Sequence, residues 1–588
     1  MKLPSIASLI KTSFNSIIRF PLASLFSAGV CFTAMYLIEY EPARTESMVF
    51  KLMTMMVIGV PLMIGIQSLA EQNIERPVRR WLFYFCGVSV LALYLIFIAP
   101  DFNVIEMVKP TRFIAMLVVA HLFVAVAPYL KYGQISDFWE YNKNIFIIWI
   151  AGALYGLIIF TGLSIAILSV DQLFGVRVDS KLYGHVFVLV ATIFHPIYFM
   201  SNYPKNFHQI SQDEHFAMLI LNLVKYILIP LSILYISILY LYGVKITIDW
   251  SLPKGWVSSL VIGFSIVGML TYLLNYRLSE TEQNGLIVWF RKWFFYLLSP
   301  LVILLYIAIF KRLMDYGFTP ERYFVLITGL WLSFISIYFI ISKRDNIKWI
   351  PLSLIFFLLV GTYSPIDAFH ISSKSQTNRL FSLYEKNKLI KNGKLQADNS
   401  GVLDSGEQNM IASIINLLSE INASDQLNEK LATPAPADSI KMNNGSALIL
   451  RALGIKNNTG LNNEGIIYNF YSDTYQANDI QGYQKMTKVD VYKGDKKENG
   501  LELSQNNKTI LWKDKNAIIA TMDFENKLKI VVEKFGNNGQ NIKPDELSQI
   551  FENKNYKMKI CIQQLGVEMN NGEYLIHNLD GYFLFTKK

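Results

Sequence analysis

Hydrophobic and polar residues are distributed very unevenly along this chain. Before His370, apolar runs of roughly 17 to 25 residues follow one another and are separated by short charged stretches. After His370 no apolar run is that long, and Lys, Asn, Asp and Glu become frequent. A helix needs ~20 apolar residues to cross a hydrocarbon core of ~30 Å. The pattern therefore predicts a bundle of membrane-spanning helices followed by a domain outside the bilayer.

The bundle is predicted to contain eleven spans. They are expected at residues 21–38, 50–69, 82–99, 112–130, 145–169, 183–201, 217–241, 256–275, 293–310, 322–341 and 347–363. With the N-terminus in the cytoplasm, fifteen Lys and Arg flank the spans inside and eleven outside, which is the bias that the positive-inside rule expects. An odd number of spans then places the C-terminal domain outside the cytoplasm. We expect a multi-pass protein of a bacterial inner membrane.

The N-terminal segment, residues 1–20, has its own pattern. Apolar residues fall near helical spacing at Leu3, Ile6, Leu9, Ile10, Phe14, Ile17 and Ile18, with Lys2, Lys11 and Arg19 among them. This spacing predicts an amphipathic helix that lies in the membrane interface before the first span. An ordinary helix packed on the cytoplasmic end of the bundle fits the pattern equally well. No cleavable signal peptide is evident.

The part of the chain beyond the polytopic segment 21–365 is predicted to be an α+β domain, residues 366–588. Helices are expected through Arg379 and from about Ser405, with a turn at Asn392-Gly393 between them. Strands are expected at 465–471, 484–492, 508–513, 516–522, 527–533, 557–564 and 573–586. Asn570-Asn571-Gly572 is typical of a hairpin turn before the last strand.

Charge and cysteine content narrow the classes of function. The chain up to His370 has 27 Lys and Arg against 20 Asp and Glu, and the remainder has 27 against 25. The positive charge therefore flanks membrane helices and gives no sign of nucleic-acid binding. The three cysteines have no metal-binding or disulfide spacing. The sequence contains no P-loop, nucleophile elbow, zinc-protease motif or dinucleotide fingerprint, so we expect no cofactor and no metal.

Three residues of the seventh span are candidate functional residues. Lys225 lies inside an apolar helix, where a charge is costly unless it faces the bundle interior or reaches the surface. Pro230 would free a backbone carbonyl and could bend the helix toward a cavity, and Tyr235 lies in the same span. Lys225 would bind an anion or transfer a proton. The alternative is that its side chain extends to the membrane surface, and that the bend encloses no cavity.

The loop from Arg312 to Tyr323 holds four more candidates. Asp315 is expected to form an ion pair with Arg312 or Arg322. Tyr316 lies between these two arginines in the sequence. Thr319 followed by Pro320 predicts the start of the next helix. The loop is interpreted either as a structural cap or as a site for a ligand or partner.

Two features near the fifth span predict a position at the membrane surface and close helix packing. Phe138 to Lys143 combines aromatic residues with a lysine, which is typical of an interfacial belt; a surface for a cytoplasmic partner is the alternative. Gly152 and Gly156 form a small-xxx-small pair, which predicts close helix packing.

Several of these stretches together resemble a known family. The stretches are Phe138 to Lys143, Lys225 to Lys245, Leu252 to Ser258, Asp315 to Gly317 with Arg322 and Tyr323, and Ser375-Gln376 with Arg379-Leu380. The chain is similar to the bacterial membrane proteins catalogued as domain of unknown function 4153, from about residue 10 to about residue 400. The resemblance implies a polytopic topology and adds no catalytic residue.

The leading hypothesis is a non-enzymatic envelope protein that either transports a small solute or belongs to a membrane complex. Its partners would be the lipid bilayer and other membrane proteins. Two alternatives stay open: a sensor whose C-terminal domain binds an extracytoplasmic ligand, and an enzyme acting on a lipid-linked substrate with Asp315 or Glu321 near the membrane surface.

Overall fold

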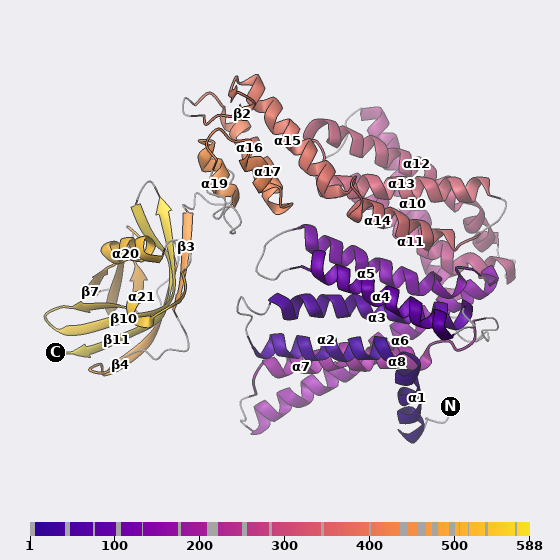
Figure 1. Ribbon diagram of the computed structural model, residues 1–588, viewed down its shortest axis with the longest axis horizontal. Helices are drawn as coiled ribbons and strands as arrows, with labels where there is room; N and C mark the ends of the chain where they lie inside the picture. Colours follow the sequence, from indigo (N-terminus) through magenta and orange to yellow (C-terminus); the bar gives the residue numbers. More distant parts are fainter. Residues whose placement is uncertain are drawn as a thin grey trace. The chain divides into compact units, whose positions relative to one another are not determined.

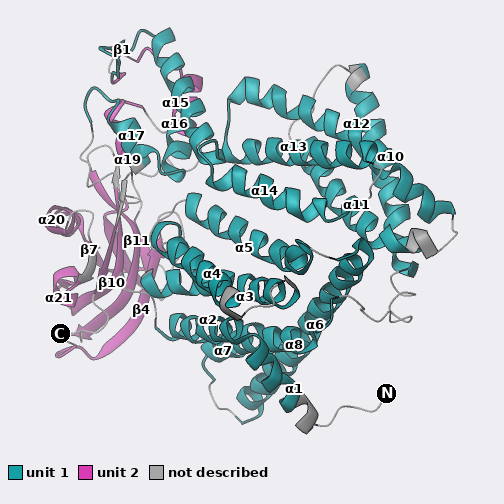
Figure 2. Cartoon of the chain, turned by 45° about the vertical axis from the view of Figure 1, so that its right-hand side comes forward, with its two compact units in different colours: residues 1–396, 414–446 teal, residues 397–413, 447–588 magenta. Residues whose placement is uncertain are grey.

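The chain folds into two compact units (Figure 2). One comprises residues 1–396 and 414–446, and the other residues 397–413 and 447–588. The computed structural model describes residues 6–40, 47–73, 77–100, 107–131, 133–174, 178–207, 221–249, 256–281, 285–342, 346–398, 401–434, 445–455, 466–472, 480–492, 500–504, 506–514, 517–535, 539–570 and 573–588.

Long apolar helices make up most of the first unit (Figure 1). They are α2 (Pro21–Glu39), α3 (Ser47–Asn73), α4 (Pro77–Phe97), α5 (Val108–Val126), α6 (Ile135–Phe174), α7 (Lys181–Leu189), α8 (His195–Asn202), α10 (Ile229–Asp249), α11 (Trp256–Thr281), α12 (Gly285–Tyr316), α13 (Pro320–Ile341) and α14 (Trp349–Tyr363). In the described residues ten stretches are long and apolar enough to cross a membrane. An eleventh is reached if α14 and α15 (Ala368–Lys386), bent by 44°, form one span. The predicted bundle of about eleven spans is confirmed.

The spans form two groups that meet along one seam. Helices α2 to α5 pack on one another and on α7, and α10 to α14 form the second group. Helix α5 packs against α14, while α6 contacts α8 of the first group and α11 of the second. Figure 2 shows α6 running between the groups. Its 40 residues extend about 60 Å, twice the thickness of a hydrocarbon core, so α6 continues beyond the bilayer.

Two spans contain a π-helical turn, and a proline follows each one. Val190–Phe194 precedes Pro196, and Val224–Leu228 precedes Pro230. Proline lacks the backbone N–H and its ring clashes with the carbonyl four residues earlier, so a wider turn accommodates it. The predicted irregularity at Pro230 is thus a wide turn within a continuous span.

Helix α1 (Ile6–Arg19) lies across the end of α2 (Figure 1). Ile10, Phe14, Ile17 and Ile18 share one face and are exposed. Ser16 is buried on the other side, where the Ser201 hydroxyl of α8 donates to its hydroxyl (3.1 Å). The predicted amphipathic helix therefore packs by its polar side and leaves its apolar side uncovered by the described residues.

Beyond α14 the chain continues with α15 and a hairpin of β1 (Ile390–Lys391) and β2 (Lys394–Leu395). Asn392 and Gly393 have φ of +52° and +73°, as expected for the predicted two-residue turn. Helices α16 (Ser405–Glu420), α17 (Ser424–Asn428) and α19 (Gly445–Ala452) follow. The Asp404 carboxylate accepts the backbone N–H of Glu407 (2.8 Å), which explains why α16 begins where predicted.

Two sheets, antiparallel except for one parallel pair, form most of the second unit. The strands are β3 (Ile466–Ser472), β4 (Lys485–Tyr492), β5 (Leu501–Leu503), β6 (Thr509–Asp514), β7 (Ala517–Asp523), β8 (Gly539–Ile542), β9 (Gln549–Glu552), β10 (Tyr556–Asn570) and β11 (Glu573–Lys587). The larger sheet has the order β4-β11-β10-β3-β8, with β9 also pairing with β10 and β8 parallel to β3; the smaller is β5-β6-β7. The long β10–β11 pair confirms the hairpin expected near Asn570.

The strand predicted at 527–533 is wrong. These residues belong to helix α20 (Glu525–Phe535), which follows β7 and precedes the short helix α21 (Pro544–Leu547). Leu528, Val531 and Val532 are buried at helical spacing, in a core shared with the sheet strands. The Asp523 carboxylate accepts the Glu525 N–H (2.9 Å) at the start of the helix. Packing against the sheet outweighs the β-propensity of the valines.

Candidate functional site

The loop between α12 and α13 is ordered and bound to α15. Gly317, with φ of +71°, turns the chain. The Ser375 hydroxyl accepts the N–H of Phe318 (3.0 Å), and the Gln376 amide donates to the carbonyls of Tyr316 (3.0 Å) and Phe318 (2.7 Å). A Cβ on Gly317 would lie 3.0 Å from the Ser375 hydroxyl. The predicted Thr319 cap and first-turn Pro320 of α13 are confirmed.

The ion pair expected for Asp315 is not formed among the described residues. Asp315 is exposed, and within those residues no Arg nitrogen lies within 4.0 Å of its carboxylate. Arg322 instead donates to the carbonyls of Tyr316 (3.3 Å) and Gly317 (2.9 Å). Because the chain turns at Gly317, the carbonyls of Tyr316 and Gly317 accept the Arg322 hydrogen bonds that the Asp315 carboxylate was expected to accept. Arg312 is half-buried.

A buried carboxylate that the sequence interpretation missed joins α5, α14 and α15. The Asp367 side chain is 0% exposed and accepts a charge-assisted bond from Arg112 of α5 (2.7 Å). Its other oxygen accepts the N–H groups of Phe369 (3.0 Å) and His370 (2.8 Å), which caps α15. The His370 ring lies 2.8 Å from the same oxygen. All oxygens of this buried acid are therefore occupied.

Arg112 has further partners at the end of α14. Its Nε donates to the carbonyl of Thr362 (3.0 Å), and the Tyr363 hydroxyl donates to the carbonyl of Arg112 (2.6 Å). The Tyr323 hydroxyl of α13 donates to the carbonyl of Ile366, one residue before Asp367. Ends of α5, α13 and α14 thus converge on the start of α15. The signal in the sequence was an Asp one residue before a helix and an Arg at the start of a span, but their separation hid the pairing.

Lys225, Pro230 and Tyr235 do not converge on a common site. The Lys225 side chain is half-buried in the π-helical turn, and its ammonium lies 5.2 Å from the centre of the Tyr226 ring. Pro230 and Tyr235 are exposed on the described surface of the span. Tyr240, one turn further, donates to the carbonyl of Leu297 in α12 (2.7 Å) and fastens α10 to its neighbour.

Phe138 to Lys143 is not an interfacial belt. Phe138, Trp139 and Tyr141 are buried, and Trp139 donates to the carbonyl of Leu273 in α11 (2.6 Å). Lys143 and Glu140 are also buried and form an ion pair (2.5 Å). The aromatic rings face the interior because α6 begins between the two helix groups. The segment therefore connects the two helix groups, and the expectation of an interfacial belt was wrong.

More polar contacts surround this segment, at the end of the seam opposite Asp367. The Tyr141 and Tyr203 hydroxyls lie 2.5 Å apart, and Tyr203 also contacts the hydroxyl of Ser68 (2.7 Å). Lys348, next to α14, donates to the carbonyls of Tyr129 (3.3 Å) and Gly133 (3.1 Å). Both ends of the seam are thus held by polar groups, with apolar packing between them.

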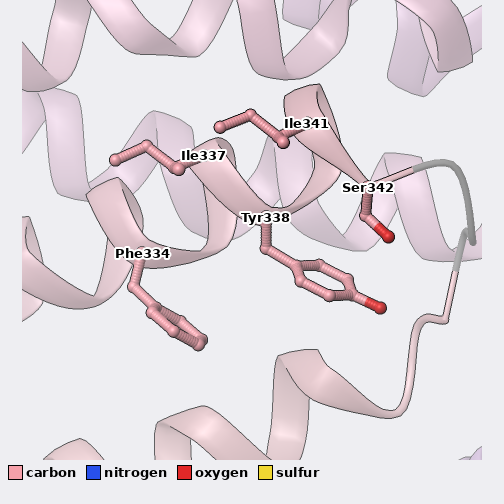
Figure 3. Close-up of a pocket in the computed structure, with 5 residues that line it drawn as sticks. All are labelled: Phe334, Ile337, Tyr338, Ile341 and Ser342. Atoms are coloured by element: carbon pink, nitrogen blue, oxygen red, sulfur yellow. The ribbon is translucent and has the colours of Figure 1, made fainter.

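Shallow hollows are present on the described surface of both units. One, of about 320 Å³, lies on α13 and is lined by Phe334, Ile337, Tyr338, Ile341 and Ser342 (Figure 3). The other lies in the second unit and is lined by Lys485, Met486, Thr487, Trp512 and Phe585. The first is almost wholly apolar, as expected for a groove on a span that faces acyl chains. Neither is lined by Lys225 or Asp315.

The fold and these polar clusters define a multi-pass helical membrane protein with a C-terminal α+β region. The chain belongs to the family described as domain of unknown function (DUF4153), which it matches over residues 52–404. It is 25% identical over 195 residues to an uncharacterized protein, PM1469, of Pasteurella multocida (strain Pm70). That match covers 33% of each chain, so it spans about a third of the relative's length. No solved structure matches.

Proposed function

We propose that this protein is a non-enzymatic component of a complex in a bacterial inner membrane. In this proposal the spans hold α15 as a fixed base for the C-terminal region. The convergence on α15 supports it: Asp367 joins α15 to α5, and Ser375 and Gln376 join it to the loop between α12 and α13. Contacts from several spans on one helix suit a protein that positions an extramembrane part.

The proposed topology places the C-terminal domain outside the cytoplasm. The Lys and Arg bias supports this orientation, and so does the odd number of spans that is reached if α14 and α15 form one span. Alkaline phosphatase fused after Lys588 should be active, because it folds only outside the cytoplasm. Green fluorescent protein fused at the same position and exported through the Sec pathway should be dark. The reverse pair of results would refute the orientation.

The interfacial position of α1 belongs to the same proposal. Its apolar face, formed by Ile10, Phe14, Ile17 and Ile18, is exposed at an end of the bundle, where the headgroup layer lies. A spin label at Phe14→Cys, in a chain without its native cysteines, should be reached by lipid-soluble oxygen more readily than by a water-soluble nickel complex. The opposite preference would mean that α1 lies in water.

Chemical cross-linking in native membranes tests the complex. The full chain, purified under mild conditions, should retain the same protein partners at fixed stoichiometry by quantitative mass spectrometry. Ser375→Ala combined with Gln376→Ala removes the bonds to the loop and should weaken this association, whereas Lys374→Ala, on an exposed position of α15, should not. A full chain that is always recovered alone would overturn the proposal.

Transport is a second candidate, and Lys225 is the observation that favours it. This cation lies in a π-helical turn of a span beside Pro230, and such turns are frequent at functional sites. Lys225→Cys tests for a water-filled path, because a short Cys side chain cannot reach the surface as Lys can. Labelling by a water-soluble maleimide would support a path. Labelling only by a membrane-permeant reagent would argue against a water-filled path and would mean that the native Lys225 side chain extends to the membrane surface.

A further inference from the structure

We propose that Arg312, Arg322 and Arg379 form a binding site for a phosphate group at the membrane surface. The three residues come from three elements: the end of α12, the first turn of α13 and the middle of α15. The phosphate could belong to a lipid headgroup or be free in solution, and the same chemistry would recognise both.

Two of the three cations lie at one exposed ring, and the third acts on one of them electrostatically. The guanidinium carbons of Arg322 and Arg379 lie 5.2 and 5.9 Å from the centre of the Tyr316 ring. The positive charges of Arg312 and Arg379 both repel that of Arg322. Tyr316 is 52% exposed, so the cluster opens toward its surroundings.

The cluster lacks a close counter-ion for two of its members. In the described part of the chain no carboxylate lies within 4.0 Å of Arg312 or Arg322. Glu321 attracts Arg322 from a greater distance, and both Glu321 and Asp315 are exposed. The Arg322 bonds to the two carbonyls use only Nη1, while a guanidinium has five N–H donors.

An anion would relieve this arrangement. Holding three guanidinium groups close together is unfavourable, because their positive charges repel one another and are partly buried. A bound anion that accepts hydrogen bonds from their N–H groups offsets both costs. The planar guanidinium matches phosphate oxygens in pairs, which favours phosphate over a spherical anion.

The position along the chain favours a lipid phosphate. Arg312 and Arg322 flank the short connection between two helices that are each long enough to span a bilayer, and such a connection lies at headgroup depth. A phosphodiester in the adjacent leaflet could therefore reach the cluster without leaving the membrane. This inference does not depend on the proposed role in a complex.

Native mass spectrometry of the full chain tests the site. Delipidated protein in detergent is offered phosphatidylglycerol, or diacylglycerol as a phosphate-free lipid. The variant Arg312→Gln/Arg379→Gln removes two cations but keeps Arg322, which holds the loop. Lys374→Gln removes a cation from an exposed position of α15 and serves as the control. Melting temperatures of the native chain, the double variant and the Lys374→Gln control verify folding. A further variant, Arg379→Lys, keeps the positive charge but lacks the planar guanidinium that donates paired hydrogen bonds.

The expected result is retention of phosphatidylglycerol but not diacylglycerol by the native chain and the control. The double variant should bind about tenfold more weakly or worse, since charge-assisted hydrogen bonds are lost. If millimolar inorganic phosphate displaces the lipid and itself raises the melting temperature, free phosphate is also a ligand; if it does neither, the site is for lipid. Equal retention by the native chain and a folded double variant would overturn the proposal.

Discussion

Replacing Asp367 by Ala should destabilise the membrane unit more than most single changes in this chain. The substitution removes the helix cap of α15 and the partner of Arg112 at once. Loss of an N-cap costs about 1 kcal/mol, and breaking a buried ion pair costs about 3–5 kcal/mol. The Arg112 side chain is 23% exposed and keeps its hydrogen bond to Thr362, so the lower end of that range applies to the loss of the Arg112–Asp367 ion pair. Since the two losses overlap, we expect about 3–4 kcal/mol in total.

Two further variants separate the cap from the charge. Asp367→Asn keeps an oxygen that can accept the backbone N–H groups and loses only the charge, so it should cost about 1–2 kcal/mol. Asp315→Ala removes an exposed Asp that has no close cation in the described residues, and it should change stability by at most about 0.5 kcal/mol. This small effect is expected because the ion pair predicted for Asp315 is not formed among the described residues.

Thermal unfolding in detergent, at one heating rate, provides the assay. Membrane proteins of this size commonly unfold irreversibly, so the three variants are compared with the native chain under identical conditions. A loss of 1 kcal/mol lowers the melting temperature of a 150–250-residue domain by about 2–4 °C, and less for a larger one. Asp367→Ala should therefore melt on the order of 5 °C lower. If the Asp367→Ala and Asp315→Ala variants melted at the same temperature, the assignment of Asp367 as the residue that connects the spans would be refuted.

Three other changes have expected outcomes. Gly317→Ala should lower the melting temperature by the equivalent of about 1–2 kcal/mol, because its φ of +71° is unfavourable for Ala; an unchanged value would mean that the loop adapts. Gly152→Leu should cost about 1–3 kcal/mol, since a Cβ there would approach an aromatic ring of α8 to 2.9 Å, whereas Gly162→Leu on the same helix meets nothing within 4 Å and should be tolerated. In the C-terminal unit, Lys588 holds the pKa of Glu552 below its ordinary value, so Lys588→Ala should raise that pKa in an NMR titration. The contribution of this pair is present at neutral pH and is lost as the pH falls through the lowered pKa, and an unshifted titration would contradict it.

The spans were predictable because the bilayer imposes a long and simple signal. Each apolar run satisfies its own backbone hydrogen bonds as a helix, so length and composition suffice to locate it. The least regular span is the last one: α14 has only 15 residues and reaches spanning length only with α15. The close approach expected at Gly152 and Gly156 is also present, because a Cβ at either position would lie about 3 Å from side chains of the neighbouring span.

The polar contacts were much harder to predict, because they join residues far apart in sequence. Arg112 and Asp367 are separated by 255 positions, and neither stands in a recognisable motif. Phe138 to Lys143 has the composition of an interfacial belt, and only the position of α6 between the helix groups places it inside. The 527–533 segment was mispredicted for a related reason. Its valines favour a strand locally, but packing against the sheet, which the local sequence does not reveal, stabilises a helix.

The seam between α5 and α14 also dictates when the membrane unit can be completed during synthesis. Thr362 and Asp367, the partners of Arg112, are made 250 and 255 residues after it. At about 5–20 residues per second, that interval lasts roughly 10–50 s. Throughout it α5 is in the bilayer with an arginine whose counter-ion does not yet exist. In a chain that stops before α14, Arg112 therefore lacks both Thr362 and Asp367, so an unfinished molecule differs from a finished one by an unpaired charge at the end of α5.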